Sequence, residues 1–393
     1  MRVNAVHRGH FNEYESSNAQ LTQRSNKAFL LVPLLLGLSY SIYTVSLRAK
    51  IGSTMGTNYS FMVLITSMET IPGVFSVVMG YYSDKFGGRL SIYFGFAASI
   101  LLILFPFLPM ELIPLLVFSF VTMYMIYTPY IYGIILRKAM GSGKKLSMLL
   151  MMFSIGWTCG GLFPAFLSLV GKGDMGFFIA SFLMMLSAWI LVGIYGGNSF
   201  HEASKFSIGD FRNALSTAWW TAIGLILWSS GYSMLSGVFS LKLYNSVGSQ
   251  FEYGFYFTFI TGMASIIIRP YAGMLVDRIS PLKMITASTM AYLLLSLILL
   301  RAPPALIIIL WILPIYPFFD TSSYSLLSRI MTIQLQSTAA GIMSTSLSIG
   351  GGLNLAMYYM LRNQSYSTIL LVDSVIFALS IAWFMIAPRK FSK

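Results

Sequence analysis

Twelve apolar runs, each about 20 residues long, follow one another along this chain of 393 residues. An α-helix needs about 20 apolar residues to cross the hydrocarbon core of a bilayer. Because a spanning segment must satisfy its backbone hydrogen bonds internally, the runs predict an all-α membrane protein with twelve transmembrane helices. They cover residues 28–47, 58–82, 88–109, 112–136, 146–170, 175–196, 215–241, 252–276, 282–300, 303–328, 338–361 and 366–387.

The polar stretches between the runs predict the domain organisation. The longest internal one, 197–214, falls between the sixth and seventh runs and divides them into two sets of six. We expect a tail at 1–27, an N-terminal six-helix bundle at 28–196, a linker at 197–214, a C-terminal six-helix bundle at 215–387 and a tail at 388–393. The third and fourth runs are separated mainly by Pro109, Met110 and Glu111, so a count of eleven spans stays open.

Composition excludes two other classes of protein. The chain is 56% hydrophobic and 9% charged, whereas a soluble domain has about 25% charged residues. The net charge of +13 does not indicate nucleic-acid binding, because the bases lie in short loops and form no basic face with interleaved aromatics. Cys159 is the one cysteine, so no intrachain disulfide can form, and we interpret it as a packing residue.

The distribution of Lys and Arg predicts the orientation in the membrane. If both termini are cytosolic, 18 of the 25 Lys and Arg lie in cytosolic segments, and Arg269 lies within a span. The remaining six lie in the outer loops: Arg48, Lys50, Lys172, Lys242, Arg301 and Arg362. This bias follows the positive-inside rule. We therefore predict a multi-pass protein of the cell membrane with both termini and the linker in the cytoplasm.

Two stretches of the sequence repeat each other at the ends of apolar runs. They read GYYSDKFGGR at 80–89 and GMLVDRISPLK at 273–283, and they start 193 residues apart (273 − 80). A motif that recurs half a chain later at a helix end indicates duplicated halves, which are the usual build of secondary transporters.

The 80–89 stretch resembles the signature between the second and third helices of the major facilitator superfamily, roughly Gly-x-Leu-Ala-Asp-Arg-x-Gly-Arg-Lys. Its glycines, acid and bases match, while Tyr82 replaces Leu and Gly88 replaces the first base of the closing pair. In the second half Ser280 stands where the second glycine belongs. The matching residues are Gly80, Asp84, Lys85, Gly87 and Arg89, then Gly273, Leu275, Asp277 and Arg278.

The motif residues have a physical interpretation as a conformational gate, formed by Gly80, Asp84, Lys85, Gly87, Arg89, Gly273, Asp277 and Arg278. The two first glycines allow close helix contact, and Gly87 permits a tight turn. The resemblance implies that Asp84 faces the start of the eleventh span near Ser337, and that Asp277 faces the start of the fifth near Leu146. Each aspartate would then stabilise the positive end of a helix. The alternative is that these are ordinary solvated loop charges.

Four charged residues lie within the spans, where a charge is unfavourable and indicates function or pairing. Asp320 lies in the tenth span with Tyr316 and Tyr324 on the same helical face, and Glu69 lies near the middle of the second. We predict that Asp320, with Glu69 as the reserve, couples transport to protons. We expect structural roles for Arg269, with Asp277 as its possible partner, and for Asp373.

The resemblance implies that the first, fourth, seventh and tenth spans line a central cavity. The candidate cavity residues on these spans are Tyr40, Thr44, Tyr124, Tyr127, Trp228, Tyr232, Tyr316 and Tyr324. Rings with few charges suit a moderately apolar or cationic organic solute better than a multiply charged phosphate ester.

These observations predict a secondary active transporter that moves a small organic solute by alternating access, coupled to protons. Two alternatives stay open: a facilitator without a coupling ion, and a transporter-like membrane sensor. The sequence shows no Walker loop, zinc-ligand pair, nucleophile elbow or dinucleotide fingerprint. We therefore expect no enzyme activity, catalytic residue, metal or cofactor, and we expect a monomer whose partners are solute, protons and lipid.

Overall fold

The computed structural model describes residues 28–48, 50–51, 54, 59–195, 208–247, 252, 255–361 and 364–386. Within these ranges the chain is helical and contains no β-strand. The predicted tails at 1–27 and 388–393 lie outside the described residues, as does the 197–207 part of the predicted linker.

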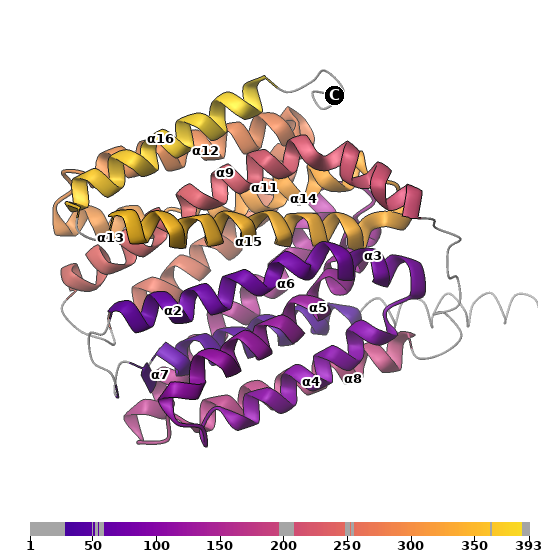
Figure 1. The fold of residues 1–393 in the computed structure, drawn as a ribbon, viewed down its shortest axis with the longest axis horizontal. Helices are drawn as coiled ribbons and strands as arrows, with labels where there is room; N and C mark the ends of the chain where they lie inside the picture. The colour runs from indigo at the N-terminus through magenta and orange to yellow at the C-terminus, as the bar shows by residue number, and fades with distance from the viewer. Residues whose placement is uncertain are drawn as a thin grey trace, which may run out of the picture.

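The helices form two groups that lie side by side in Figure 1. The N-terminal group consists of Ala28–Arg48, α2 (Tyr59–Thr70), η1 (Ile71–Phe75), α3 (Ser76–Phe86), α4 (Arg89–Leu104), η2 (Met110–Leu112), α5 (Ile113–Ala139), α6 (Gly143–Gly160), α7 (Leu162–Leu169) and α8 (Met175–Tyr195). The C-terminal group consists of α9 (Ile208–Val247), η4 (Phe255–Ile260), α11 (Thr261–Ile279), α12 (Pro281–Leu299), α13 (Pro304–Ile312), α14 (Tyr316–Ile330), η5 (Ile333–Leu335), α15 (Gln336–Leu361) and α16 (Tyr366–Met385).

Ten helical stretches of the described chain are long and apolar enough to cross a membrane. The chain is therefore an all-α, multi-pass membrane protein. The other two predicted runs correspond to α4, which has 16 residues, and to α15, which has 26. The third and fourth runs are separate helices, because α4 ends at Leu104 and α5 begins at Ile113.

Prolines interrupt several spans. Pro72 and Gly73 lie in the short 3-10 helix η1 between α2 and α3, and these two residues favour a kink there. The predicted run 303–328 is divided into α13 and α14, and the backbone is extended at Leu313. Pro314 follows directly and has no N–H to continue the helix.

Helix α9 begins at Ile208, inside the predicted linker 197–214, and is 40 residues long. Asp210 lies in its first turn, where a negative charge stabilises a helix. The predicted span that begins at 215 therefore covers the apolar part of α9 but not the polar first turns of this helix.

The most extensive contacts between the groups are made by two antiparallel helix pairs: α3 packs along α15, and α6 packs along α11. We call the end of the molecule that carries the 80–89 and 273–283 stretches the motif end; it lies on the right of Figure 1. Both helix pairs approach closely at this end.

Candidate functional site

Asp84 joins the two groups at the motif end. Its carboxylate accepts hydrogen bonds from the backbone N–H groups of Ser337 (3.1 Å) and Thr338 (2.7 Å) in the first turn of α15, and from the Thr338 hydroxyl (2.8 Å). Arg137, in the last turn of α5, forms an ion pair with it at 3.0 Å. The predicted contact between Asp84 and this helix start is confirmed. We call these four residues the Asp84 clamp.

Asp277 makes the corresponding contact in the second half. It accepts hydrogen bonds from the backbone N–H groups of Gly143 (2.7 Å) and Lys144 (2.9 Å) in the first turn of α6, and it pairs with Arg329 at 2.9 Å. We call these four residues the Asp277 clamp. The predicted partner helix is correct, but it starts at Gly143 rather than near Leu146, because Ser142 caps it.

The first glycine of each motif lets the groups approach closely. A Cβ atom on Gly80 would collide with the carbonyl oxygen of Ser337, and one on Gly273 would collide with that of Gly143. No larger residue could stand at either position without separating the helices.

The second glycine position is a turn in both halves. Gly87 has φ = 81°, and Ser280 has φ = 126° at the equivalent position. The Ser280 side chain partly offsets the strain of this backbone conformation, because it caps α12 by accepting a hydrogen bond from the Lys283 N–H.

The bases of the motifs lie at the surface. The Lys85 ammonium group lies over the rings of Tyr81 and Phe86, 5.8 and 5.2 Å from their centroids. Arg89 and Arg278 are exposed. The arginines that form ion pairs with the motif aspartates, Arg137 and Arg329, lie outside the two motifs.

Asp320 is buried at the interface between the groups and forms an ion pair with Arg269. Asp320 Oδ2 lies 2.9 Å from Arg269 Nη2, and Arg269 Nε donates a hydrogen bond to Ser154 Oγ on α6 at 2.7 Å. The expected pairing of Arg269 with Asp277 is wrong: its side chain does not extend along α11 to the motif end but crosses to α14 and α6. Arg269 therefore links Asp320 to the opposite group.

Glu69 pairs with Arg48, at the end of the first span (Ala28–Arg48), at 2.7 Å. The Tyr43 hydroxyl donates to the same carboxylate at 3.5 Å. Assigning Arg48 to an outer loop misses this contact, since Arg48 is part of the helix and its side chain reaches α2.

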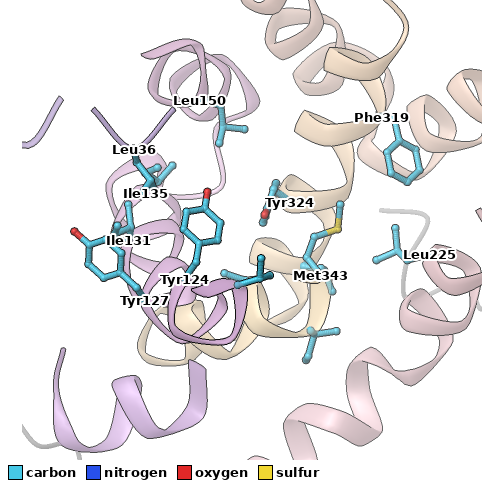
Figure 2. Close-up of a cluster of buried hydrophobic side chains, with 14 of the residues drawn as sticks. Leu36, Tyr124, Tyr127, Ile131, Ile135, Leu150, Leu225, Phe319, Tyr324 and Met343 are labelled. Carbon is cyan, nitrogen blue, oxygen red and sulfur yellow. The ribbon is translucent and has the colours of Figure 1, made fainter. Parts of the chain in front are cut away.

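The predicted cavity residues of the N-terminal group separate into two places. The rings of Tyr40 and Tyr124 stack, with their centroids 4.5 Å apart. The Thr44 hydroxyl donates a hydrogen bond to the Tyr40 carbonyl, one turn away. Figure 2 shows Tyr124 pointing toward the space between α5 and α14, and Tyr127 pointing away. The Tyr127 hydroxyl lies 3.1 Å from Ser187 Oγ on α8, so this tyrosine belongs to the packing within its group.

In the C-terminal group, the ring of Trp228 stacks on that of Tyr232, with a centroid distance of 4.7 Å, and lies beside that of Tyr316, with a centroid distance of 6.4 Å. Tyr324 stacks on Tyr132 of α5 at 5.1 Å, and so connects the two groups. On α14, Tyr316 lies one turn before Asp320 and Tyr324 one turn after it. The structure therefore brings Tyr40 and Tyr124 into one aromatic cluster and Trp228, Tyr232 and Tyr316 into a second, while Tyr324 stacks across the interface between the groups.

Two pockets lie in the C-terminal group. A small one, of about 90 Å³, is lined by aromatic and hydroxyl side chains that include Tyr232, Trp311 and Tyr316. A larger groove, of about 490 Å³, is lined by apolar and small side chains of α11 to α14, including exposed Leu294 and Leu313. The small pocket adjoins the aromatic cluster and so belongs to the candidate site.

Sequence reasoning missed Arg137, Arg329 and Ser154. The two arginines were counted only as loop charges, although they lie 192 residues apart (329 − 137), close to the spacing of the motifs. This near-repeat was a usable signal. Nothing in the sequence marks Ser154 as the partner of Arg269.

The fold and these contacts define a multi-pass α-helical membrane protein of the transporter type, with two groups of helices joined by matching clamps. The family model of the Major Facilitator Superfamily matches residues 29–355, and the chain belongs to this family. No curated protein matches the sequence.

Solved transporter structures share the fold. A mutant of the nucleoside transporter NupG superposes with a TM-score of 0.67 at 13% identity, over 92% of this chain and 99% of that one. The transporter FucP in the outward conformation gives 0.68 at 13% identity, over 91% and 97%. A variant of the E. coli fucose:proton symporter FucP gives 0.65 at 13%, over 91% and 97%. At this identity the likeness shows the fold alone.

Proposed function

We propose that this protein is a proton-coupled secondary active transporter that moves a small organic solute across the cytoplasmic membrane by alternating access. Its first six and last six spans act as two bundles connected by the cytosolic linker 197–214. Both termini are cytoplasmic, and the protein works as a monomer without enzymatic activity.

The observation that carries this proposal is the position of Asp320. Its ion pair with Arg269 is buried between the groups, and Arg269 also holds Ser154 of the opposite group. A proton taken up by Asp320 removes the charge that orients Arg269. The contact between Arg269 and Ser154 then changes, so protonation and the relative position of the bundles are linked. Glu69 keeps the reserve role, with Arg48 in place of Arg269.

The two clamps serve as the cytosolic gate. Each holds an aspartate of one bundle against a helix start of the other, and both are closed here. The positive-inside bias places this end in the cytosol, so the described conformation is closed to the cytosol.

The aromatic clusters favour a substrate with a flat or apolar body. Tyr40, Tyr124, Trp228, Tyr232 and Tyr316 supply rings, while the nearby charged groups form the internally neutralised pairs Arg269–Asp320 and Arg48–Glu69. A moderately apolar or cationic organic solute suits these surroundings. FucP is described as a fucose:proton symporter, which is consistent with proton coupling on this fold.

The test is transport by purified protein in liposomes. Ligands are first found by a thermal-shift screen, and their flux is then measured with and without an imposed pH gradient. We expect wild type to accumulate the solute in response to the gradient. Asp320→Asn should exchange solute across the membrane without accumulating it, and Glu69→Gln is run beside it.

If the wild-type flux is the same with and without the pH gradient, the protein is an uncoupled facilitator. If Asp320→Asn still concentrates the solute, Asp320 is not the coupling residue. If no solute moves at all although ligands bind, the sensor alternative replaces transport.

A further inference from the structure

Asp373, on α16, carries a buried carboxyl group. Its side chain is 0% exposed, and both oxygens lack a partner among the described residues. Asp84, Asp320 and Glu69 differ, since each forms an ion pair with an arginine. The proton-coupling role proposed above for Asp320 and Glu69 does not involve Asp373.

The carboxyl group of Asp373 faces the backbone of α9. A Cβ atom on Gly231 would lie 3.3 Å from Asp373 Oδ1 and 3.1 Å from the ring of Phe377, one turn further along α16. Phe377 in turn stacks on Tyr292 of α12 at 5.9 Å. The carboxyl group is therefore enclosed by a helix backbone and an aromatic ring, neither of which solvates a negative charge.

The helices packed against α16 offer no counter-charge. Asp373 is the only charged residue of α16, which packs on α9 and α12. The nearest charged residue on α9 is Lys242, 11 residues beyond Gly231 (242 − 231), or about 16 Å along the helix. On α12 it is Lys283, nine residues before Tyr292 (292 − 283), or about 14 Å.

The polar groups close to Asp373 are neutral or already engaged. Tyr232, next to Gly231 on α9, and Tyr292 on α12 are the titratable side chains that these helices place in this region. The hydroxyls of Ser374 and Ser296 bond to each other at 2.8 Å. None of these groups neutralises a carboxylate.

We propose that Asp373 is a proton-binding site separate from Asp320, and that it holds its proton in the conformation described here. In such surroundings an unpaired carboxylate is far more unfavourable than the neutral acid. Asp373 faces the backbone of α9 at Gly231, and the same helix carries Trp228 and Tyr232 of the aromatic cluster. A tilt of α9 would open the carboxyl group to water and release the proton. This inference does not depend on the coupling role of Asp320.

Infrared difference spectroscopy of the full-length protein in lipid tests the proposal. Replacing Asp373 by Asn should remove a protonated-carboxyl C=O band, which shifts in D2O, and should leave the carboxylate bands unchanged. Loss of carboxylate bands would overturn the proposal. The matched control is Asp174→Asn, since Asp174 is 58% exposed and pairs with Lys50; it should remove carboxylate bands only.

A second measurement uses the wild-type protein, so it stands even if Asp373→Asn folds poorly. An apolar carbodiimide adds to a protonated carboxyl group and the product rearranges to a stable N-acylurea. We expect mass spectrometry to find this adduct at Asp373 and not at Asp320, which is paired with Arg269. An adduct at Asp320 with none at Asp373 would overturn the proposal.

Discussion

Arg137 and Arg329 hold corresponding positions in the two halves, and each pairs with the motif aspartate of its own half, at 3.0 Å to Asp84 and 2.9 Å to Asp277. Each aspartate simultaneously binds a helix start of the opposite group. The two clamps differ in burial, because the Asp84 side chain is 0% exposed and that of Asp277 is 33% exposed.

This difference predicts unequal effects of the two matched substitutions. Asp84→Asn should weaken closure of the motif end by about 1–3 kcal/mol, because buried donors of α15 lose a charged acceptor. Asp277→Asn should weaken it by about 1 kcal/mol or less, because water replaces part of the contact. Accessibility of single cysteines near the motif end reports the shift. Equal effects would contradict the role of burial.

The close approach at Gly80 predicts that one methyl group opens the motif end. Gly80→Ala would place Cβ against the Ser337 carbonyl, so α3 and α15 must separate. Cysteine accessibility at the motif end should rise. The matched control is Gly193→Ala on α8, where nothing lies within 4 Å of the added Cβ. If the two variants behave alike, the glycine contact does not control closure.

The buried pair of Arg269 and Asp320 predicts strong coupling in a double-mutant cycle. Arg269→Gln leaves a buried carboxylate unpaired, and Asp320→Asn leaves a buried guanidinium unpaired. Each should destabilise the protein by about 3–5 kcal/mol. The double substitution should cost clearly less than the sum, as measured by the thermal unfolding midpoint in detergent. Additive losses would show that the two side chains do not interact.

The backbone at Ser280 predicts a stabilising substitution. With φ = 126° and ψ = 148°, this residue lies in a region that strains a side chain by about 1–3 kcal/mol. Glycine removes the strain and loses only a few tenths of a kcal/mol of helix capping. Ser280→Gly should therefore raise the unfolding midpoint. Gly87→Ala, which adds a side chain at the equivalent turn, should lower it.

The charge bias predicts the topology. Cysteines introduced at Ser204 and Ser392, in a background without the exposed Cys159, should resist impermeant thiol reagents in intact cells. They should react after the membrane is permeabilised. Labelling of Ser204→Cys from outside would contradict the predicted orientation. Both clamps would then lie on the outer side of the membrane.

Much of the fold could be predicted from the sequence, because the positions and lengths of the apolar runs depend only on local composition. The interruption at Pro72 and Gly73 likewise depends on the residues present at that position. The break at Leu313–Pro314 was missed, since Pro314 lies inside an apolar run whose length alone indicates one helix. The polar first turns of α9 were missed because polar residues are equally compatible with a linker.

The candidate site could be predicted only in part. The resemblance supplied the helix partners of Asp84 and Asp277, which no local pattern contains. The partner of Asp320 was not predictable, because Arg269 lies on another helix and its direction depends on how α11 packs against α14 and α6. Tyr127 shows the same limit: one helical turn decides whether a ring faces the other group or α8.

The crosswise arrangement of the clamps has a consequence for how sharply the protein switches. Asp84 belongs to the first half and holds α15 of the second, while Asp277 belongs to the second and holds α6 of the first. If each half moves as a rigid body, neither clamp can open without the other, so their free energies add within a single equilibrium. A clamp worth about 1.4 kcal/mol changes an equilibrium tenfold. Duplication of the half therefore multiplies two such factors, and converts a modest bias into a nearly binary choice between two shapes.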